Sequence, residues 1–201
     1  MSLQPELSDS ALWEAVRAGD AEAFTGMIKR YSRFLIGYGR KLTNDQELVK
    51  DCIQDLFADI WLYRSNLSPS AAVHTYLLVS LRRKIHRSTR GNDYIQFKES
   101  EADDYPFMVT FSVQDQWLQS ETEHQQLLQL NHVINALPER QKEVLYLKFY
   151  QNLDHYEIAE LLDIQYQSVS NLVQRALAHL RKNWREEFTP LLFFMLSADF
   201  L

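Results

Sequence analysis

Hydrophobic residues recur every three or four positions along most of the chain, which is the spacing of helices that bury one face. In the first ninety residues this spacing predicts helices over about 11–18, 21–42, 44–63 and 73–88. The third has the clearest apolar stripe, formed by Leu48, Cys52, Ile53, Leu56, Phe57, Ile60 and Trp61. Only 5 Gly and 5 Pro occur in 201 residues. The pattern therefore predicts an all-α fold with long helices and few tight turns.

The helical spacing stops after the fourth helix, at an acidic stretch over 92–115 that ends in an apolar patch over 107–113. This composition is typical of an extended linker, and we expect the patch to dock on a folded part of the chain. Helical spacing resumes near Gln116. The predicted organisation is two small helical domains, 8–91 and 116–184, joined by the acidic linker over 92–115 and followed by an apolar tail over 185–201.

The second domain contains three predicted helices: residues 138–150, a helix that Asp154 and Glu157 begin as a capping box, and residues 167–181. Asp163 and Ile164 form the turn between the last two, a helix-turn-helix that can present a helix to the DNA major groove. The predicted outward side chains suit base edges and phosphates: Gln165, Gln167, Ser168, Ser170, Asn171, Gln174 and Arg175. A helical hairpin with a solvated polar face has the same pattern, and the scarcity of basic residues weakens the DNA interpretation.

Charge is distributed unevenly, although the net charge is only −6. Residues 1–92 have 13 Lys and Arg against 10 Asp and Glu, 93–124 have 1 against 8, and 125–201 have 7 against 9. The basic residues concentrate on the fourth helix, where no acid occurs between Ser65 and Asn92. The spacing puts Arg83, Arg87 and Arg90 on one face, an arrangement that suits a phosphate backbone. Aromatic residues near these arginines in sequence favour an interpretation in which the helix binds unstacked bases. A solvated helix end accounts equally well for the arginines.

The third helix has a row of acids opposite its apolar stripe, at Asp51, Asp55 and Asp59. Like charges at this spacing repel by roughly 0.2–0.5 kcal/mol per pair. A row that costs stability indicates a basic protein partner, although solvated acidic rows are common. The single cysteine, Cys52, lies on the apolar side and is interpreted as a core residue.

Sequence signatures of enzymes are absent, so we expect no catalytic activity, cofactor, metal or small-molecule substrate. The six histidines form no i, i+4 pair, and the chain has no glycine-rich phosphate loop and no GxSxG. One cysteine excludes an intrachain disulfide and fits a reducing, cytoplasmic location. The first residues lack the features of a signal peptide, and the longest apolar run is far shorter than the ~20 residues that cross a bilayer.

Taken in order, these features resemble a bacterial sigma factor of the extracytoplasmic-function type, over roughly residues 10–184. LVKDCIQDLFADIW is similar to the family's helix that binds core RNA polymerase. TYLLVSLRRKIHRSTR resembles the helix that melts the promoter and reads its −10 element. LPERQKEVLYLKFYQNLDHYEIAELLDI and the helix after it resemble the −35-reading domain. The order and spacing of these blocks are more specific than any one block.

The resemblance implies a division of labour between the domains. The third helix would bind core polymerase through Asp51, Gln54, Asp55, Phe57, Asp59 and Trp61. The fourth helix would bind the −10 strand through His74, Tyr76, Arg82, Arg83, Lys84, Arg87 and Arg90. The second domain would read −35 DNA through the outward residues given above, and the acidic linker would follow the polymerase's RNA exit path. An anti-sigma factor is the further implied partner, and catalysis would belong to the polymerase.

The chain departs from the family's usual residues at four positions of these sites. Arg83 replaces Asn, Asp163 replaces Gly, Gln165 replaces Ser or Thr, and Ser170 replaces Lys or Arg. These changes weaken the expected turn, cap and phosphate contacts. The apolar tail extends beyond the family's core, and we expect it to dock on a domain or on an inhibitor. The alternatives are a helix-turn-helix regulator, whose usual α/β receiver is not predicted for this chain, and a helical adaptor that binds no DNA.

Overall fold

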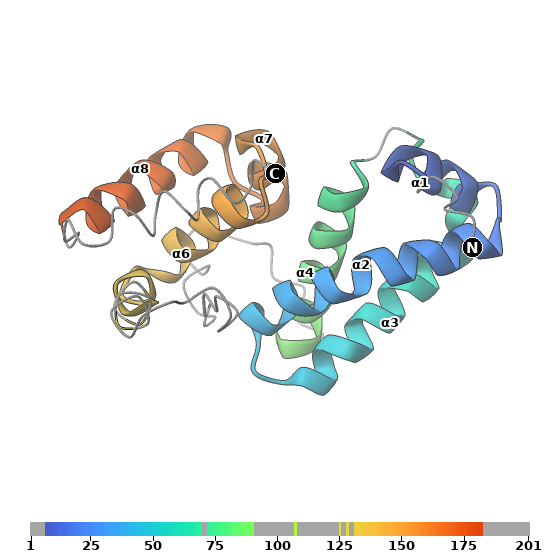
Figure 1. The fold of residues 1–201 in the computed structure, drawn as a ribbon, viewed down its shortest axis with the longest axis horizontal. Helices are drawn as coiled ribbons and strands as arrows, with labels where there is room; N and C mark the ends of the chain where they lie inside the picture. Colours follow the sequence, from blue (N-terminus) through green and yellow to red (C-terminus); the bar gives the residue numbers. More distant parts are fainter. Residues whose placement is uncertain are drawn as a thin grey trace. The chain divides into compact units, whose positions relative to one another are not determined.

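The computed structural model describes residues 7–69, 72–90, 107, 125, 128 and 131–182. The chain divides into two compact units, over 1–95 and 96–201, and each unit has its own set of packed helices (Figure 1). Within the described ranges all regular structure is helical. The predicted all-α fold is therefore confirmed, and the described part of the first unit has none of the strands that a receiver domain would need.

The N-terminal unit is a bundle of three long helices covered by a short one (Figure 1). Its elements are α1 (Asp9–Arg17), α2 (Ala21–Leu42), α3 (Gln46–Leu62), the 3₁₀ turn η1 (Arg64–Asn66) and α4 (Val73–Arg90). Helices α2, α3 and α4 pack against one another, and α1 packs on α2 and α4. Ser8, Asp20 and Asp45 each accept backbone N–H bonds at the start of a helix, as expected for N-cap side chains.

Two features hold this bundle closely together. Trp13 of α1 is 1% exposed, packs edge-on against Tyr76 of α4, and donates its indole N–H to the Ser68 carbonyl at 2.8 Å. Gly39 lets α2 approach α3, because a Cβ at this position would lie 2.5 Å from Cγ1 of Val49. The short helix and the missing side chain thus shape the unit as much as the apolar stripe of α3.

The C-terminal unit is built on the predicted helix-turn-helix. Its elements are α6 (Glu139–Leu145), the π-helical turn η2 (Tyr146–Tyr150), α7 (His155–Leu162) and α8 (Tyr166–Lys182). Asp154 and Glu157 form the predicted capping box of α7. Asp163 ends that helix in the left-handed region, at φ 56° and ψ 48°, a conformation that glycine adopts more easily. Helix α8 packs against both α6 and α7.

Phe107 connects the predicted linker to this unit. Its side chain is fully buried, its ring packs edge-on against Tyr146 at 5.6 Å, and its backbone N–H donates to the Glu139 carboxylate. This residue therefore docks on α6 and η2, as expected for the apolar patch. The rest of the linker, the tail and the greater part of the helix expected over 116–137 lie outside the described residues.

Candidate nucleic-acid and partner interfaces

The outer face of α3 presents most of the acidic row that the sequence predicts. Asp51, Gln54 and Asp55 are exposed, while Cys52 is 3% exposed on the opposite face. Burial raises the pKa of the Cys52 thiol, so this cysteine is a packing group with little thiolate character. Asp59 differs from the other two acids because its carboxylate forms a 2.7 Å ion pair with Nζ of Lys84 on α4. The free acidic surface is therefore centred on Asp51 and Asp55.

The aromatic residues predicted to bind polymerase lie at different depths. Phe57 is only 6% exposed, with its ring 6.4 Å from that of Phe24 on α2. The apolar stripe of α3 places this ring in the core of the unit, and its contact with polymerase stays a prediction. Trp61 is partly exposed between Phe24 at 4.8 Å and the Arg64 guanidinium at 4.5 Å. Trp61 can still contact a partner at the end of α3.

The predicted basic face of α4 is divided by burial. Arg82 is 3% exposed and donates to the Tyr38 hydroxyl at 3.3 Å, so it lies in the core of the unit, and its contact with DNA stays a prediction. Arg83 and Arg87, one turn apart, are exposed, and Lys84 is paired with Asp59. The exposed cationic surface on α4 thus contains Arg83 and Arg87. The side chain of Arg90 lies outside the described residues.

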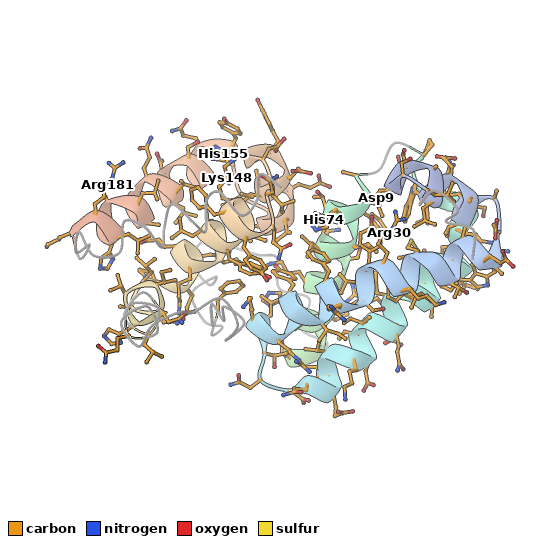
Figure 2. The ribbon with its side chains drawn as sticks, in the orientation of Figure 1. Asp9, Arg30, His74, Lys148, His155 and Arg181 are labelled. Carbon is orange, nitrogen blue, oxygen red and sulfur yellow. The ribbon has the colours of Figure 1, made fainter. Side chains whose placement is uncertain are left out.

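The aromatic candidates on α4 lie near its beginning and are held by other helices. The rings of His74 and Phe34 are 4.2 Å apart, and Tyr76 packs on Trp13, so both candidates are only partly exposed. Figure 2 shows His74 on α4 close to the labelled Asp9 and Arg30. His74 and Tyr76 precede Arg83 by nine and seven residues, roughly 10–14 Å along a helix. The helix therefore separates the aromatic candidates from the exposed arginines.

Helix α8 presents a polar face with one cation among the seven predicted residues. Gln165, Gln167, Asn171, Gln174 and Arg175 are exposed, and Ser168 and Ser170 are partly exposed. The Gln167 amide donates to Oδ1 of Asn171 at 3.3 Å. The Ser170 hydroxyl lies 3.2 Å from Nδ1 of His155. All seven reach the surface of the helix, but Ser170 is already engaged with α7.

An exposed aromatic pair at the beginning of α7 and α8 was not predicted from the sequence. Tyr156 of α7 is 73% exposed, Tyr166 of α8 is 43% exposed, and their ring centroids are 4.6 Å apart. The His155 ring lies 5.5 Å from that of Tyr166. A tyrosine can contact a thymine methyl through its ring and a phosphate through its hydroxyl. The sequence feature that could have indicated this pair is the position of both tyrosines outside the apolar stripes of their helices.

The described part of the chain contains no group of three or more His, Cys, Asp or Glu residues that could hold a metal ion. In the same part, no helix is long and apolar enough to span a membrane. The surfaces that remain are an acidic face on α3, a basic face on α4 and a polar face on α8. These features suit binding to proteins and nucleic acid.

Comparison with protein families gives two matches in chain order. The family model Sigma-70 region 2 matches residues 27–94, and Sigma-70, region 4 matches residues 127–180. The first match contains α3 and α4, and the second contains α6, α7 and all but the last two residues of α8. Together the two matches cover more than half of the chain and include every surface described above.

Curated relatives and solved structures agree with this order. The chain is 25% identical over 166 residues to RNA polymerase sigma factor YlaC of Bacillus subtilis, covering 81% of this chain and 92% of that protein. It is 26% identical over 175 residues to ECF RNA polymerase sigma factor RpoE of Cereibacter sphaeroides, covering 86% and 93%.

Two solved structures share the fold. CnrH in complex with the cytosolic domain of CnrY has a TM-score of 0.56 at 18% identity, over 87% of this chain and 95% of that one. The sigma factor RpoE in complex with the anti-sigma factor NepR, from Bartonella quintana, has a TM-score of 0.55 at 14% identity, over 81% and 96%. The two-unit helical architecture is therefore shared along most of each chain.

Proposed function

The chain belongs to the extracytoplasmic-function class of the sigma-70 family of RNA polymerase sigma factors, and from this premise we propose how its surfaces divide the work of promoter recognition. The observation that carries the proposal is the separation of charge in the N-terminal unit, where acids are exposed on α3 and arginines on α4. A sigma factor has to bind polymerase and promoter at the same time. Separate surfaces of opposite charge on one rigid bundle allow it to do so.

Core polymerase binds the outer face of α3 in this proposal. Asp51, Gln54 and Asp55 supply an exposed acidic and polar patch, and Trp61 supplies a partly exposed ring at the end of the same helix. Complementary charge steers encounter and fixes the register of an interface. Asp51 and Asp55 lie one turn apart and repel each other in the free chain. A basic partner reduces this electrostatic repulsion when it binds.

The −10 strand binds the exposed side of α4 through Arg83 and Arg87. Arginine suits this role because its planar guanidinium contacts phosphate with two N–H groups and stacks on bases. Lys84 contributes positive potential nearby, although its ammonium is paired with Asp59. His74 and Tyr76 lie further toward the start of α4, where a base displaced from the duplex can contact the exposed part of their rings.

The C-terminal unit reads the −35 element through α8. Its polar face and the Tyr156–Tyr166 pair can contact base edges and thymine methyl groups. Of the seven residues predicted to face DNA, only Arg175 is a cation, and nonspecific DNA affinity depends mainly on phosphate neutralisation. Free chain should therefore bind −35 duplexes weakly, and polymerase has to supply much of the hold on the promoter.

The remaining parts of the proposal concern partners and location. CnrH was solved in complex with the cytosolic domain of CnrY, and the sigma factor RpoE in complex with the anti-sigma factor NepR. We extend an anti-sigma partner to this chain. The chain acts in the cytoplasm, where polymerase and promoters are found. Sigma factors are not a family of enzymes, and in this assignment bond formation takes place in the polymerase alone.

The test is a pull-down with core polymerase, followed by transcription from a genomic DNA library. The unmodified chain should bind polymerase and start transcripts at a defined set of promoters, from which the −10 and −35 sequences follow. The double variant Asp51→Arg, Asp55→Arg should lose polymerase binding by at least about tenfold, because two attractive contacts become repulsive.

A control matched in charge is the double variant Glu14→Arg, Glu22→Arg, which changes two exposed acids on α1 and α2 of the same unit. This variant should bind polymerase like the unmodified chain. Absence of binding by the unmodified chain, with any anti-sigma factor removed, would contradict the proposal. Equal loss in the control would show that the effect is net charge and not the α3 surface.

A further inference from the structure

Helix α1 presents one stripe of side chains to the start of α4 and to the turn before it. Asp9, Trp13 and Arg17 form this α1 stripe, because they follow one another at intervals of four residues and so lie on one side of the helix. Helix α1 lies before the Sigma-70 region 2 match, which begins at residue 27. The family match therefore assigns no role to the stripe.

Trp13 joins Tyr76 of α4 to the turn before that helix. Its ring is 1% exposed and meets the Tyr76 ring edge-on, with centroids 5.3 Å apart. Its indole N–H donates to the Ser68 carbonyl at 2.8 Å, across 55 residues of chain. An edge-on pair constrains the orientation of both rings, and Tyr76 stays partly exposed. Trp13 thus sets the direction in which the exposed part of Tyr76 points.

Arg17 holds the same turn at the preceding residue. Its Nε donates to the Leu67 carbonyl at 2.9 Å, while Nη1 donates to both carboxylate oxygens of Glu14 at 2.9 and 2.7 Å. Because a guanidinium is planar, the Glu14 contacts also fix the direction of the Nε–H group. The bonds from α1 therefore hold two consecutive carbonyls, five and six residues before α4 begins at Val73.

Asp9 extends the α1 stripe to His74. Its Oδ1 accepts a 2.7 Å hydrogen bond from Nη1 of Arg30 on α2, and Figure 2 shows His74 close to both residues. The pKa of the Asp9 carboxyl lies below its ordinary value. Partial burial raises this pKa, but the hydrogen bond and charge of Arg30 and the charge of His74 together have the larger effect. His74 thus has a carboxylate as a neighbour, as well as the Phe34 ring at 4.2 Å.

We propose that the α1 stripe positions the aromatic part of the −10 site, by holding His74 and Tyr76 in the orientation that receives an unpaired base. The inference rests on the proposed function, which places these two residues at the −10 strand. A base displaced from the duplex stacks on an aromatic face, and binding is weaker when that face has to lose freedom. Rings that α1 already holds lose little, so the stripe contributes to −10 binding without touching DNA.

A role in packing alone would have different consequences. If the α1 stripe only closed the bundle, its loss would weaken polymerase binding together with −10 binding. Trp13 is buried and contributes to the core, whereas the Arg17 side chain is 21% exposed and donates to a backbone carbonyl and to Glu14. Substitution of Arg17 therefore separates positioning from packing better than substitution of Trp13.

The experiment uses holoenzyme that contains the full chain, and a forked promoter DNA from the transcription assay above, whose −10 strand is single-stranded. Arg17→Met and Trp13→Phe each remove one donor to the turn, and phenylalanine keeps an aromatic ring beside Tyr76. Each variant should weaken fork binding roughly fivefold, the effect of one lost hydrogen bond. Affinity for core polymerase should stay within about twofold, because α3 is unchanged. Arg33→Met is the control, since it removes an exposed cation of α2, and should change neither affinity.

The second readout concerns the selection of one base. Abasic sites placed one at a time along the −10 strand each remove one base. Unmodified holoenzyme should lose about tenfold affinity at one position. Arg17→Met holoenzyme should lose less than about threefold there, because its aromatic residues no longer favour one orientation. Arg33→Met should give the profile of unmodified holoenzyme. The same profile in Arg17→Met and unmodified holoenzyme overturns the proposal.

A double-mutant cycle tests whether the α1 stripe acts through the aromatic residues. In a Tyr76→Leu background, Arg17→Met should weaken fork binding by less than about twofold, since one residue that it positions is absent. Fully additive losses would mean that Arg17 acts independently of Tyr76, and the proposal would be wrong. Equal losses of polymerase and fork binding in Arg17→Met would show a packing role alone and would also overturn it. If unmodified holoenzyme fails to transcribe, the proposed function itself fails, whereas normal transcription with either contrary result removes only the positioning role.

Discussion

Each unit buries an arginine, and the two guanidinium groups meet different surroundings. Arg82 in the N-terminal unit is 3% exposed and donates to the Tyr38 hydroxyl at 3.3 Å. Arg140 in the C-terminal unit is 8% exposed, and its Nη1 has no hydrogen-bond partner. In the sequence, Arg82 belongs to a basic cluster and is predicted to bind DNA. Arg140 lies in a helix with residues of both charges, and the sequence predicts no role for it.

The two buried arginines differ in the hydrogen bonds that their surroundings offer. Arg82 uses its hydrogen-bonding capacity to join α4 to α2, which leaves Arg83 and Arg87 as the exposed cations of that helix. Arg140 keeps one nitrogen, Nη1, without a hydrogen-bond partner. We therefore expect the two buried arginines to contribute differently to the stability of their units.

Replacing both arginines with methionine tests this comparison with the largest expected effect. Arg82→Met should lower the free energy of unfolding of the N-terminal unit by about 2 kcal/mol, because the Tyr38 hydroxyl loses its donor in the core. Arg140→Met should leave the C-terminal unit unchanged or slightly more stable, because a guanidinium with a buried nitrogen that lacks a hydrogen-bond partner is replaced by an apolar side chain. Urea unfolding of the full chain, with hydrogen exchange to separate the two units, measures both changes.

Arg83→Met is the matched control for the first change, since it removes an exposed cation from the next position of α4. Its effect on stability should stay within about 0.5 kcal/mol, while binding of the −10 strand by holoenzyme should weaken. Equal destabilisation by Arg82→Met and Arg140→Met would remove the distinction between the two arginines.

A second contrast lies within α2, at two glycines separated by one residue. Gly39→Ala should destabilise the N-terminal unit by about 1–3 kcal/mol, because the new Cβ would lie 2.5 Å from Cγ1 of Val49 and 3.4 Å from Cδ1 of Ile85. Gly37→Ala should stabilise it by about 0.5–1 kcal/mol, since nothing lies within 4 Å of its Cβ and alanine favours a helix. Thermal unfolding of the two variants gives shifts of opposite sign, and shifts of one sign would contradict the close approach of α2 and α3.

Helix positions could be predicted from the sequence because each depends on a local pattern. The apolar stripe of α3, the capping box at Asp154 and the turn at Asp163 all lie where the spacing and cap residues indicate. Helix ends agree within two residues over the described ranges, except that the helix predicted over 138–150 is α-helical only to Leu145 and continues as the π-helical turn η2. No long-range information is needed for these features.

The accessibility of site residues could not be predicted to the same extent. Periodicity places Arg82 and Arg83 at neighbouring positions of one helix. Only the packing of α2 against α4 shows that Arg82 contacts Tyr38 and is buried. Phe57 is predicted both in the apolar stripe and at the partner surface, and the structure places its ring in the core. Arg140 and the Tyr156–Tyr166 pair depend on contacts between helices, which a single sequence does not show.

The start of α7 offers a smaller test of the C-terminal unit. Asp154→Ala should cost about 1 kcal/mol, because the Asp154 carboxylate accepts the backbone N–H groups of Tyr156 and Glu157 at 2.8 and 2.9 Å. Glu157→Gln should cost less, since an amide oxygen can still accept the Asp154 N–H. Hydrogen exchange of the first amides of α7 reports both losses. The same exchange rates in Asp154→Ala and the unmodified chain would show that the cap does not hold the helix.

The smallest expected effect concerns the ion pair between the predicted polymerase and DNA surfaces. Nζ of Lys84 lies 2.7 Å from Oδ2 of Asp59, with side chains 25% and 53% exposed, so solvent and salt screen the attraction. A double-mutant cycle with Asp59→Asn and Lys84→Met should give a coupling of roughly 0.2–1 kcal/mol that declines as salt is raised. A larger, salt-independent coupling would mean that this pair supports the bundle as Arg82 does. A coupling near zero would leave Asp59 available to polymerase and Lys84 available to DNA, which would extend the exposed surfaces of both helices.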